Sequence, residues 1–384
     1  MYSEDDLTSA VAAGALSAEA AAGLRTHVSA ARALPRGDEE SFRLVTSFND
    51  IFVAIGVVIL LVAVGSIGGA LGSPGSADTL LQVSLGFFLP SALVAGTAWF
   101  LAEIFARRRR MALPSIILLI AFVGAVFVTA VSVLMLPLGA VAGVDGPNDS
   151  SLDERGLANA FGAALAVTLM LGAGALTALA TWLHWRRFMV PITVAAGAAA
   201  AVGSVLGAIA LADQAVTDGR GSVAMLPLVL IAGLAVFAVA MRWDMSDRER
   251  TTRRSDVAFW LHLLAAPMIA HPLFTSLGVM DGGGAVGIAG AVGVIAIYVL
   301  FGLVALAIDR RALLVSALAY VLAALTFLFD RFGAVELNFA LTALVIGSAL
   351  LTLSAFWAPI RARVVEWLPG NWQARLPVAG LVPA

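Results

Sequence analysis

The stretch IFVAIGVVILLVAVGSIGGAL, residues 51–71, decides the fold, because none of its side chains is charged. As an α-helix rising about 1.5 Å per residue it would be about 30 Å long, which matches the hydrocarbon core of a bilayer. The bilayer interior offers no water to the backbone, so such a stretch must satisfy its own hydrogen bonds as a helix. We therefore predict a transmembrane helix here.

More apolar runs of similar length follow, and together they predict an all-α polytopic transmembrane bundle of about ten spans. We place the spans near residues 51–71, 79–105, 112–137, 157–183, 188–212, 223–241, 257–279, 285–308, 312–330 and 336–357. The composition agrees, because 61% of the residues are apolar and 12% are charged, against roughly 25% charged in soluble domains. Most of the surface must therefore face the lipid bilayer, which is the first expected partner.

Two residue types are missing from the chain. It has no cysteine, and its 23 basic residues are all arginine. The lack of cysteine excludes disulfides, thiolate metal sites and iron–sulfur clusters, and the lack of lysine excludes a retinal Schiff base and a Walker-type phosphate loop. We expect no metal, no other cofactor, no nucleic-acid partner and no catalytic residues, since no motif identifies a reaction.

Arginine placement predicts the orientation. All but three of the arginines fall in the N-terminal segment, after the even-numbered spans or after the tenth span, and the exceptions are Arg155, Arg220 and Arg331. Because arginine-rich loops stay in the cytoplasm, we expect both termini in the cytoplasm of a bacterial inner membrane. The tryptophans fall at the inner span ends and in the C-terminal tail, as an interfacial belt would.

The chain divides into three predicted regions. Residues 1–48 are polar and predict a cytosolic helical module, residues 49–357 form the ten-span bundle, and residues 358–384 form a cytoplasmic tail along the inner membrane surface. In the module we expect Gly14 to close a first helix and a second helix to start after Ser17.

Two short patterns bear on packing and on ancestry. Glycines spaced four apart, such as Gly68 and Gly72, predict close approach of neighbouring helices. The spacing RRxxxP occurs at residues 109–114 and again at 186–191. It fits either a duplicated two-helix unit or a shared preference for arginine at every inner junction with proline in the first helical turn, and we favour the second interpretation.

The seventh span holds the main candidate ligand-binding residues, His262, Pro267, His271 and Pro272. Each proline leaves a carbonyl one turn back without its donor, so we expect the helix to kink or break. Interrupted helices at mid-membrane often carry transporter binding sites. The alternative is that each histidine bonds a freed carbonyl or a neighbouring hydroxyl and only stabilises the bundle.

Their nine-residue separation puts His262 and His271 on opposite faces of an undistorted helix, so we do not expect them to share one metal ion. Secondary candidates are Asp50 at the mouth of the first span, and Glu336 with Asn338 at the outer end of the tenth. These three are more typical of helix caps or interface residues. We expect no carboxylate at mid-depth in any span.

Two stretches carry a family resemblance. AAGALSAEAA at residues 12–21 followed by FNDIF at 48–52, and AFWLHLLAAP at 258–267, resemble an uncharacterised family of predicted multi-span inner-membrane proteins of alphaproteobacterial type with a short N-terminal cytosolic helical module. The resemblance implies a multi-span layout and no activity, because the family has no established binding or catalytic residues.

Two functional hypotheses follow from the sequence. The first is a transporter-like or small-molecule-binding bundle, with a proline-broken seventh helix lining a cavity. The alternative is a non-catalytic membrane scaffold or regulator that binds a cytoplasmic protein partner through residues 1–48 and the loop at 242–256. An enzyme ranks third, because no nucleophile–base pair or metal set is present.

Overall fold

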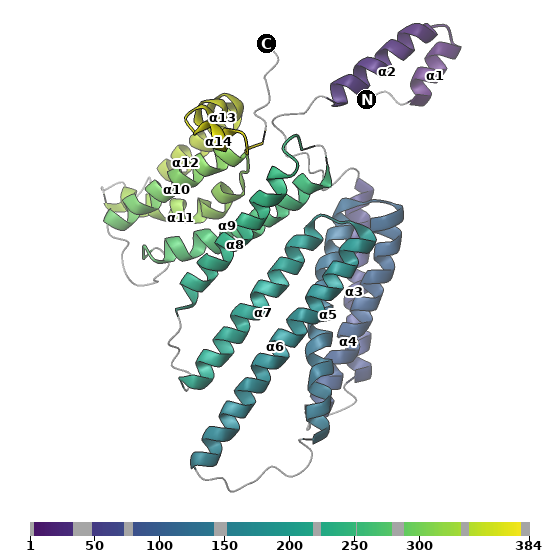
Figure 1. Cartoon of the computed structure of the whole chain (residues 1–384). Helices are drawn as coiled ribbons and strands as arrows, with labels where there is room; N and C mark the ends of the chain where they lie inside the picture. The colour runs from purple at the N-terminus through teal and green to yellow at the C-terminus, as the bar shows by residue number, and fades with distance from the viewer. Residues whose placement is uncertain are drawn as a thin grey trace.

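The computed structural model describes residues 4–33, 48–72, 80–141, 152–217, 224–250, 252–278, 288–331 and 338–377. Within these ranges every regular element is a helix and no strand occurs (Figure 1). The prediction of an all-α fold is confirmed.

The N-terminal segment forms a helical hairpin of α1 (Glu4–Ala12) and α2 (Ala18–Ala33). Gly14 between them has a φ of +68°, a left-handed conformation that glycine adopts without steric cost. The hydroxyl of Ser17 accepts a hydrogen bond from the Ala20 amide at 3.1 Å and so caps α2. Both predicted boundaries, at Gly14 and after Ser17, are confirmed.

The rest of the described chain is a bundle of long apolar helices followed by short ones. In chain order they are α3 (Phe48–Gly72), α4 (Leu80–Ala102), α5 (Ala112–Val141), α6 (Leu152–Phe188), α7 (Ile192–Val216), α8 (Met225–Met245), α9 (Arg253–Thr275), α10 (Ile288–Ile308), α11 (Ala312–Arg331), α12 (Asn338–Ala355), α13 (Trp357–Glu366) and α14 (Gly370–Gln373). A π-helical segment, η1 (Glu103–Arg108), extends α4.

Eight of these helices, α3 to α10, are long and apolar enough to cross a bilayer. They coincide with the first eight of the ten predicted spans. The predicted ninth span corresponds to a shorter apolar helix at Ala312–Thr326, and the tenth to a pair, Ala340–Ala355 and Trp357–Glu366, that bends by 76°. By length and composition, the described residues therefore contain eight helices that could cross a membrane, or up to nine if the bent pair counts as one.

Most helices that follow one another in the chain pack against each other, and the described residues form three apolar cores, the smallest of which lies around Trp357. One core, including Leu61, Ala98 and Leu118, joins α3, α4 and α5. A Cβ atom placed on Gly68 would lie 2.5 Å from the Cα atom of Pro90, so α3 and α4 approach as closely as the glycine spacing predicted.

Helix α9 is the centre of the second core, which also includes residues of α7, α8, α10, α11 and α12. In its most apolar window 56% of the residues are buried, whereas the other seven spans give 17–33%. The break expected at Pro267 and Pro272 is absent, because α9 continues as one helix from Arg253 to Thr275. Each proline removes a single backbone donor, and helices packed around α9 hold its course.

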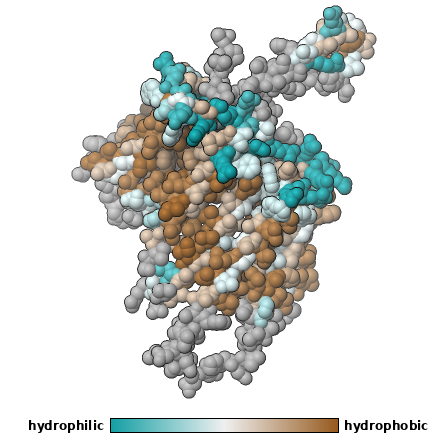
Figure 2. Space-filling model, viewed as in Figure 1, coloured by the Kyte–Doolittle hydropathy of each residue, from teal (hydrophilic) through white to brown (hydrophobic). Residues whose placement is uncertain are grey.

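The junctions that follow α4, α6, α8 and α10 lie side by side at one end of the bundle. An ion pair of 2.6 Å between Arg187 and Glu103 joins the first two, and one of 2.7 Å between Arg250 and Asp309 joins the last two. Figure 2 shows the hydrophilic residues gathered at this end above an apolar belt. We call it the arginine-rich end.

Each of these four junctions contains one non-glycine residue in the left-handed region: Arg110, Met189, Arg250 and Asp309, with φ between 54° and 57°. The junctions therefore share a turn geometry. The RRxxxP pattern is not in register with this turn geometry. In the first copy the left-handed residue is the second arginine, Arg110, whereas in the second copy it is Met189, two residues after Arg187. The mismatch supports the interpretation that each junction acquired its arginines separately.

Candidate functional site

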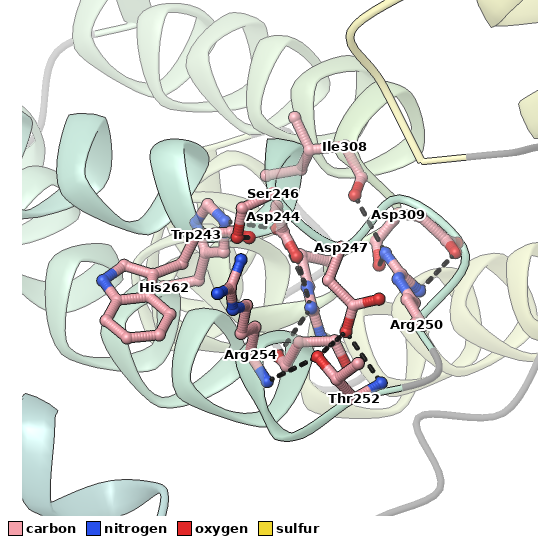
Figure 3. A network of polar contacts seen from close by, with 12 residues as sticks. Trp243, Asp244, Ser246, Asp247, Arg250, Thr252, Arg254, His262, Ile308 and Asp309 are labelled. Carbon is pink, nitrogen blue, oxygen red and sulfur yellow. Dashed lines mark hydrogen bonds and ion pairs between the residues drawn. The ribbon is translucent and has the colours of Figure 1, made fainter.

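A buried charged cluster lies where α8, α9 and the α10–α11 junction meet. It comprises Asp244 in the last turn of α8 and His262 in α9 (Figure 3). The third member is Arg310, just after α10. Arg310 donates from Nη2 to Asp244 Oδ1 at 2.6 Å and from Nε to Oδ2 at 3.3 Å. The distance between His262 Nε2 and Asp244 Oδ2 is 2.9 Å.

The burial of these three residues restricts their charges. Their side chains are 1% exposed for Asp244, 2% for His262 and 4% for Arg310. A buried carboxylate and guanidinium neutralise one another when they pair in this bidentate manner. The carboxylate can only accept, so His262 donates from Nε2, and its Nδ1 is buried without a hydrogen-bond partner in the described part of the chain.

A second set of contacts surrounds Asp309, which follows α10. Its carboxylate accepts from Arg250 Nη1 at 2.7 Å and from the indole Nε1 of Trp357 at 2.7 Å. The Arg250 guanidinium also donates to the backbone oxygens of Ile308 and Asp309. Burial lowers the pKa of Arg250, the charge of Arg310 lowers it further, and the charges of Asp309 and Asp244 oppose the shift. The contact with Trp357 ties α13 to the bundle.

The C-terminal segment closes over the same cluster. Arg361 of α13 lies with its Nε 3.5 Å from Asp309 Oδ1, and its Nη2 donates to the backbone oxygen of Pro377 at 2.8 Å. Arg248 donates to the backbone oxygen of Leu376 at 2.9 Å. The hydrogen bond of Arg248 therefore joins the tail to the α8–α9 loop, and that of Arg361 joins it to α13.

The start of α9 is fixed by Asp247. This carboxylate accepts from the Thr252 amide at 2.9 Å and from the Thr252 hydroxyl at 2.7 Å. The Thr252 hydroxyl in turn accepts from the Arg254 amide at 3.2 Å and so caps the helix (Figure 3). These bonds set the direction in which the first turn of α9 presents its arginines.

A pocket of about 400 Å³ lies between the α6–α7 junction and the α8–α9 loop. Its lining combines three large apolar side chains, two hydroxyl residues and two arginines, namely Trp185, Met189, Trp243, Ser246, Thr252, Arg253 and Arg254. No carboxylate belongs to this lining, and neither arginine side chain forms a hydrogen bond or close ion pair with a described residue. The pocket therefore offers two guanidinium groups that no described carboxylate contacts directly.

Of the residues predicted from the sequence, His262 lies in the buried cluster. His271 is exposed, and its Nδ1 lies 2.8 Å from the Tyr320 hydroxyl. The two histidines lie on opposite faces of α9, as their spacing predicted. Pro267 is exposed and Pro272 is buried. Neither histidine bonds a carbonyl freed by proline, although His271 does meet a neighbouring hydroxyl.

The secondary candidates lie apart from this cluster or outside the described residues. Asp50 is buried at the start of α3. Glu336 falls outside the described residues, and Asn338 begins α12 with a side chain that is also outside them. Among the described residues, no group of three histidine, aspartate or glutamate side chains could hold a metal ion.

No pattern in the sequence pointed to Asp244 and Arg310 as partners of His262. Asp244 was assigned to the polar loop after the sixth span, but it lies within the last turn of α8 and is buried. Its position two residues from Arg242 and next to Trp243 was typical of an interface, and the 66-residue separation from Arg310 concealed the pairing.

Comparison of the chain with protein-family models, curated proteins and solved structures finds no match. The cluster and the pocket therefore have to be interpreted from their own chemistry.

Proposed function

We propose that this chain is an integral membrane protein that binds a small anionic ligand at its arginine-rich end, in the pocket between the α6–α7 junction and the α8–α9 loop. The observation that carries the proposal is the lining of that pocket, where Arg253 and Arg254 are the charged residues and carboxylates are absent. Unpaired guanidinium groups beside aromatic side chains are a usual way to recognise anions.

The buried cluster supports this proposal by making the pocket rigid. Asp247 and Thr252 fix the first turn of α9, and the pair of Asp244 with Arg310 holds α8 and α9 together behind it. Contacts of this kind reduce the ordering that a ligand must induce, so less binding free energy is lost.

The transporter version of the first hypothesis has less support. It relied on a broken seventh helix, yet α9 is continuous, and on His271, whose side chain lies on the exposed face. We therefore propose ligand binding and leave flux across the membrane out of the proposal.

We also propose ten spans with both termini in the cytoplasm of a bacterial inner membrane, and membership of the uncharacterised multi-span family described above. The first eight spans agree with the long helices, and the short helix at Ala312–Thr326 and the bent pair at its C-terminal side supply two more apolar segments. The arginine-rich end would then face the cytoplasm.

The scaffold alternative retains one supporting observation, the separately capped hairpin of α1 and α2. The loop at 242–256 supports it less, because Asp244, Asp247 and Arg250 in that loop are engaged within the protein. Deleting residues 1–47 should leave ligand binding intact if the pocket is the functional site, whereas a scaffold would lose its partner.

The proposal is tested on the full chain in phosphatidylcholine nanodiscs, by thermal unfolding with citrate, succinate, sulfate and glycerol 3-phosphate. At least one anion should stabilise the protein saturably. The Arg253→Gln/Arg254→Gln variant should weaken that apparent affinity by about tenfold per arginine, since each contributes a charge-assisted hydrogen bond. The matched control is Arg108→Gln/Arg109→Gln, which removes two exposed charges from the same end outside the pocket.

Equal weakening in the pocket variant and in the control would reduce the effect to the general charge of that end. Stabilisation by none of the anions would contradict the proposal.

A further inference from the structure

The pocket lining has an apolar part and a charged part, and this combination restricts the class of ligand that it can bind. Trp185, Met189 and Trp243 supply large apolar surfaces, and Arg253 with Arg254 supplies charge. A small inorganic anion would contact the arginines but not the indole rings. The lining instead suits a molecule with a charged head and an apolar body.

The two arginines favour a ligand with a compact, negatively charged group. The two guanidinium groups are adjacent in sequence at the first turn of α9, where the helix N-terminus adds partial positive charge. Planar guanidinium forks match the oxygens of phosphate, and helix N-termini are frequent phosphate sites. The hydroxyls of Ser246 and Thr252 already donate to Trp243 and to Asp247, so the arginines carry the recognition.

The acidic groups near the pocket do not enter its lining. Asp247 is buried and accepts both donors of Thr252. Asp256 in the first turn of α9 is partly buried and lies within the electrostatic influence of Arg253 and of Arg310. Neither carboxylate lines the pocket.

The position of the pocket points to a ligand that reaches it from the bilayer. The end of α6 beside the pocket carries an exposed Trp182 whose ring is covered by Arg186 at 5.0 Å, together with the exposed Met189. Tryptophan and arginine together at the end of a span are typical of the depth at which lipid headgroups lie. Met189, which also lines the pocket, therefore exposes apolar surface beside it at the depth expected for lipid headgroups.

We propose that the pocket binds a phosphate-bearing amphiphile, with the phosphate between Arg253 and Arg254 and the apolar part against Trp185, Trp243 and Met189. The proposal rests on the proposed function, to which it adds the chemical class of the ligand. The phosphate can belong to an anionic phospholipid or to a free phosphate ester, and the experiment distinguishes these two sources.

The test compares the full chain in nanodiscs of pure phosphatidylcholine with the same chain in nanodiscs of phosphatidylcholine and phosphatidylglycerol. Thermal unfolding is measured in both, and inorganic phosphate and glycerol 3-phosphate are titrated into the first. Phosphatidylglycerol with brominated acyl chains is then used to quench tryptophan fluorescence, with Trp185→Phe/Trp243→Phe to identify the rings concerned.

For a lipid ligand we expect phosphatidylglycerol to stabilise the protein. In the Arg253→Gln/Arg254→Gln variant, the apparent affinity for phosphatidylglycerol should fall by at least about tenfold. The Arg108→Gln/Arg109→Gln control should keep it. Quenching should fall when Trp185 and Trp243 are replaced. Stabilisation by glycerol 3-phosphate without any effect of phosphatidylglycerol would assign the same site to a free phosphate ester.

Absence of an arginine-dependent effect from both the lipid and the soluble phosphates overturns the inference. If citrate or succinate still stabilises the protein through Arg253 and Arg254, the proposed function survives and only the phosphate chemistry fails. If no anion acts through these arginines, both proposals fail together. Far-ultraviolet circular dichroism and gel filtration of each variant confirm that it is folded before the comparison is made.

Discussion

Asp244 has an unusual position for a carboxylate, since it is almost fully buried at the end of an apolar span. Its two strong partners come from different helices, Arg310 after α10 and His262 in α9. Removing one member of a buried ion pair leaves the other charged and desolvated, whereas removing both leaves no charge to compensate. The behaviour of this pair under mutation is therefore asymmetric.

Asp244→Asn should lower the free energy of unfolding by about 3–5 kcal/mol, because Arg310 is left without its counter-charge. The double variant Asp244→Leu/Arg310→Met should be more stable than either single variant, which can be measured by denaturant unfolding in mild detergent. His262→Phe should cost less, about 1–3 kcal/mol, because Asp244 keeps Arg310. Additive single-site costs in the double variant would contradict this account of the cluster.

His271 gives the opposite expectation. It is exposed, and its Nδ1 forms a hydrogen bond of 2.8 Å with the Tyr320 hydroxyl. His271→Ala and Tyr320→Phe should each change the free energy of unfolding by no more than about 1 kcal/mol, by similar amounts. Both variants should keep the anion-dependent stabilisation in nanodiscs, and its loss in His271→Ala alone would restore His271 as a binding residue.

At the scale of single residues, the sequence identified His262 as a candidate but did not identify its partners. A histidine inside an apolar span is conspicuous in a chain with four histidines. Its partner Asp244 lies at a span end, where a carboxylate is ordinary, and Arg310 lies 66 residues beyond Asp244. The pairing depends on how α8, α9 and α10 pack, and no periodicity in one segment contains that information.

Among the helices, length and apolar composition predicted the first eight spans, because the backbone in a bilayer has few alternatives to a helix. A separate expectation, that the prolines would break α9, was wrong. Local chemistry favours an interruption at Pro267 and Pro272, but packing on every side of α9 keeps the helix continuous. Tertiary contacts overrode a local preference.

The close contact of α3 with α4 gives a test with a matched control on the next residue. A methyl group on Gly68 would meet the backbone of Pro90 at 2.5 Å, whereas a methyl group on Gly69 would meet nothing within 4 Å. Gly68→Ala should therefore destabilise the protein by about 1–3 kcal/mol, because the two backbones must move apart.

Gly69→Ala should be neutral or stabilising by up to about 1 kcal/mol, because alanine is the better helix former. Thermal unfolding of the two variants side by side provides the measurement. Equal effects would mean that α3 and α4 do not approach as described.

For the molecule as a whole, the distribution of charge was more informative than any single motif. Arginines from four junctions and from α13 lie at one end, linked by the contacts of Glu103 with Arg187 and of Asp309 with Arg250 and Arg361. The sequence predicted that these loops share a side of the membrane. It could not predict that the charges of the last two junctions are buried together, because that follows from the packing of four helices.

The orientation can be measured directly, because the natural chain has no cysteine. We expect Ser150→Cys, in the predicted external loop, to react with a membrane-impermeant maleimide on intact bacterial cells. Ala13→Cys in the N-terminal module and Ala374→Cys near α14 should react only after the membrane is permeabilised, because the proposed topology puts both termini in the cytoplasm. Labelling of Ala374→Cys from outside would show an odd number of spans or a reversed bundle.

The fastening of the C-terminal segment to the buried cluster has a consequence for biosynthesis. Asp309 emerges from the ribosome long before Trp357 and Arg361, which are two of its partners. Until α13 arrives, this carboxylate is paired with Arg250, and Arg248 in the α8–α9 loop lacks the Leu376 carbonyl to which it donates in the complete protein. The C-terminal segment therefore completes this polar network last, and a nascent chain that stalls before it leaves Asp309 without Trp357 and Arg361.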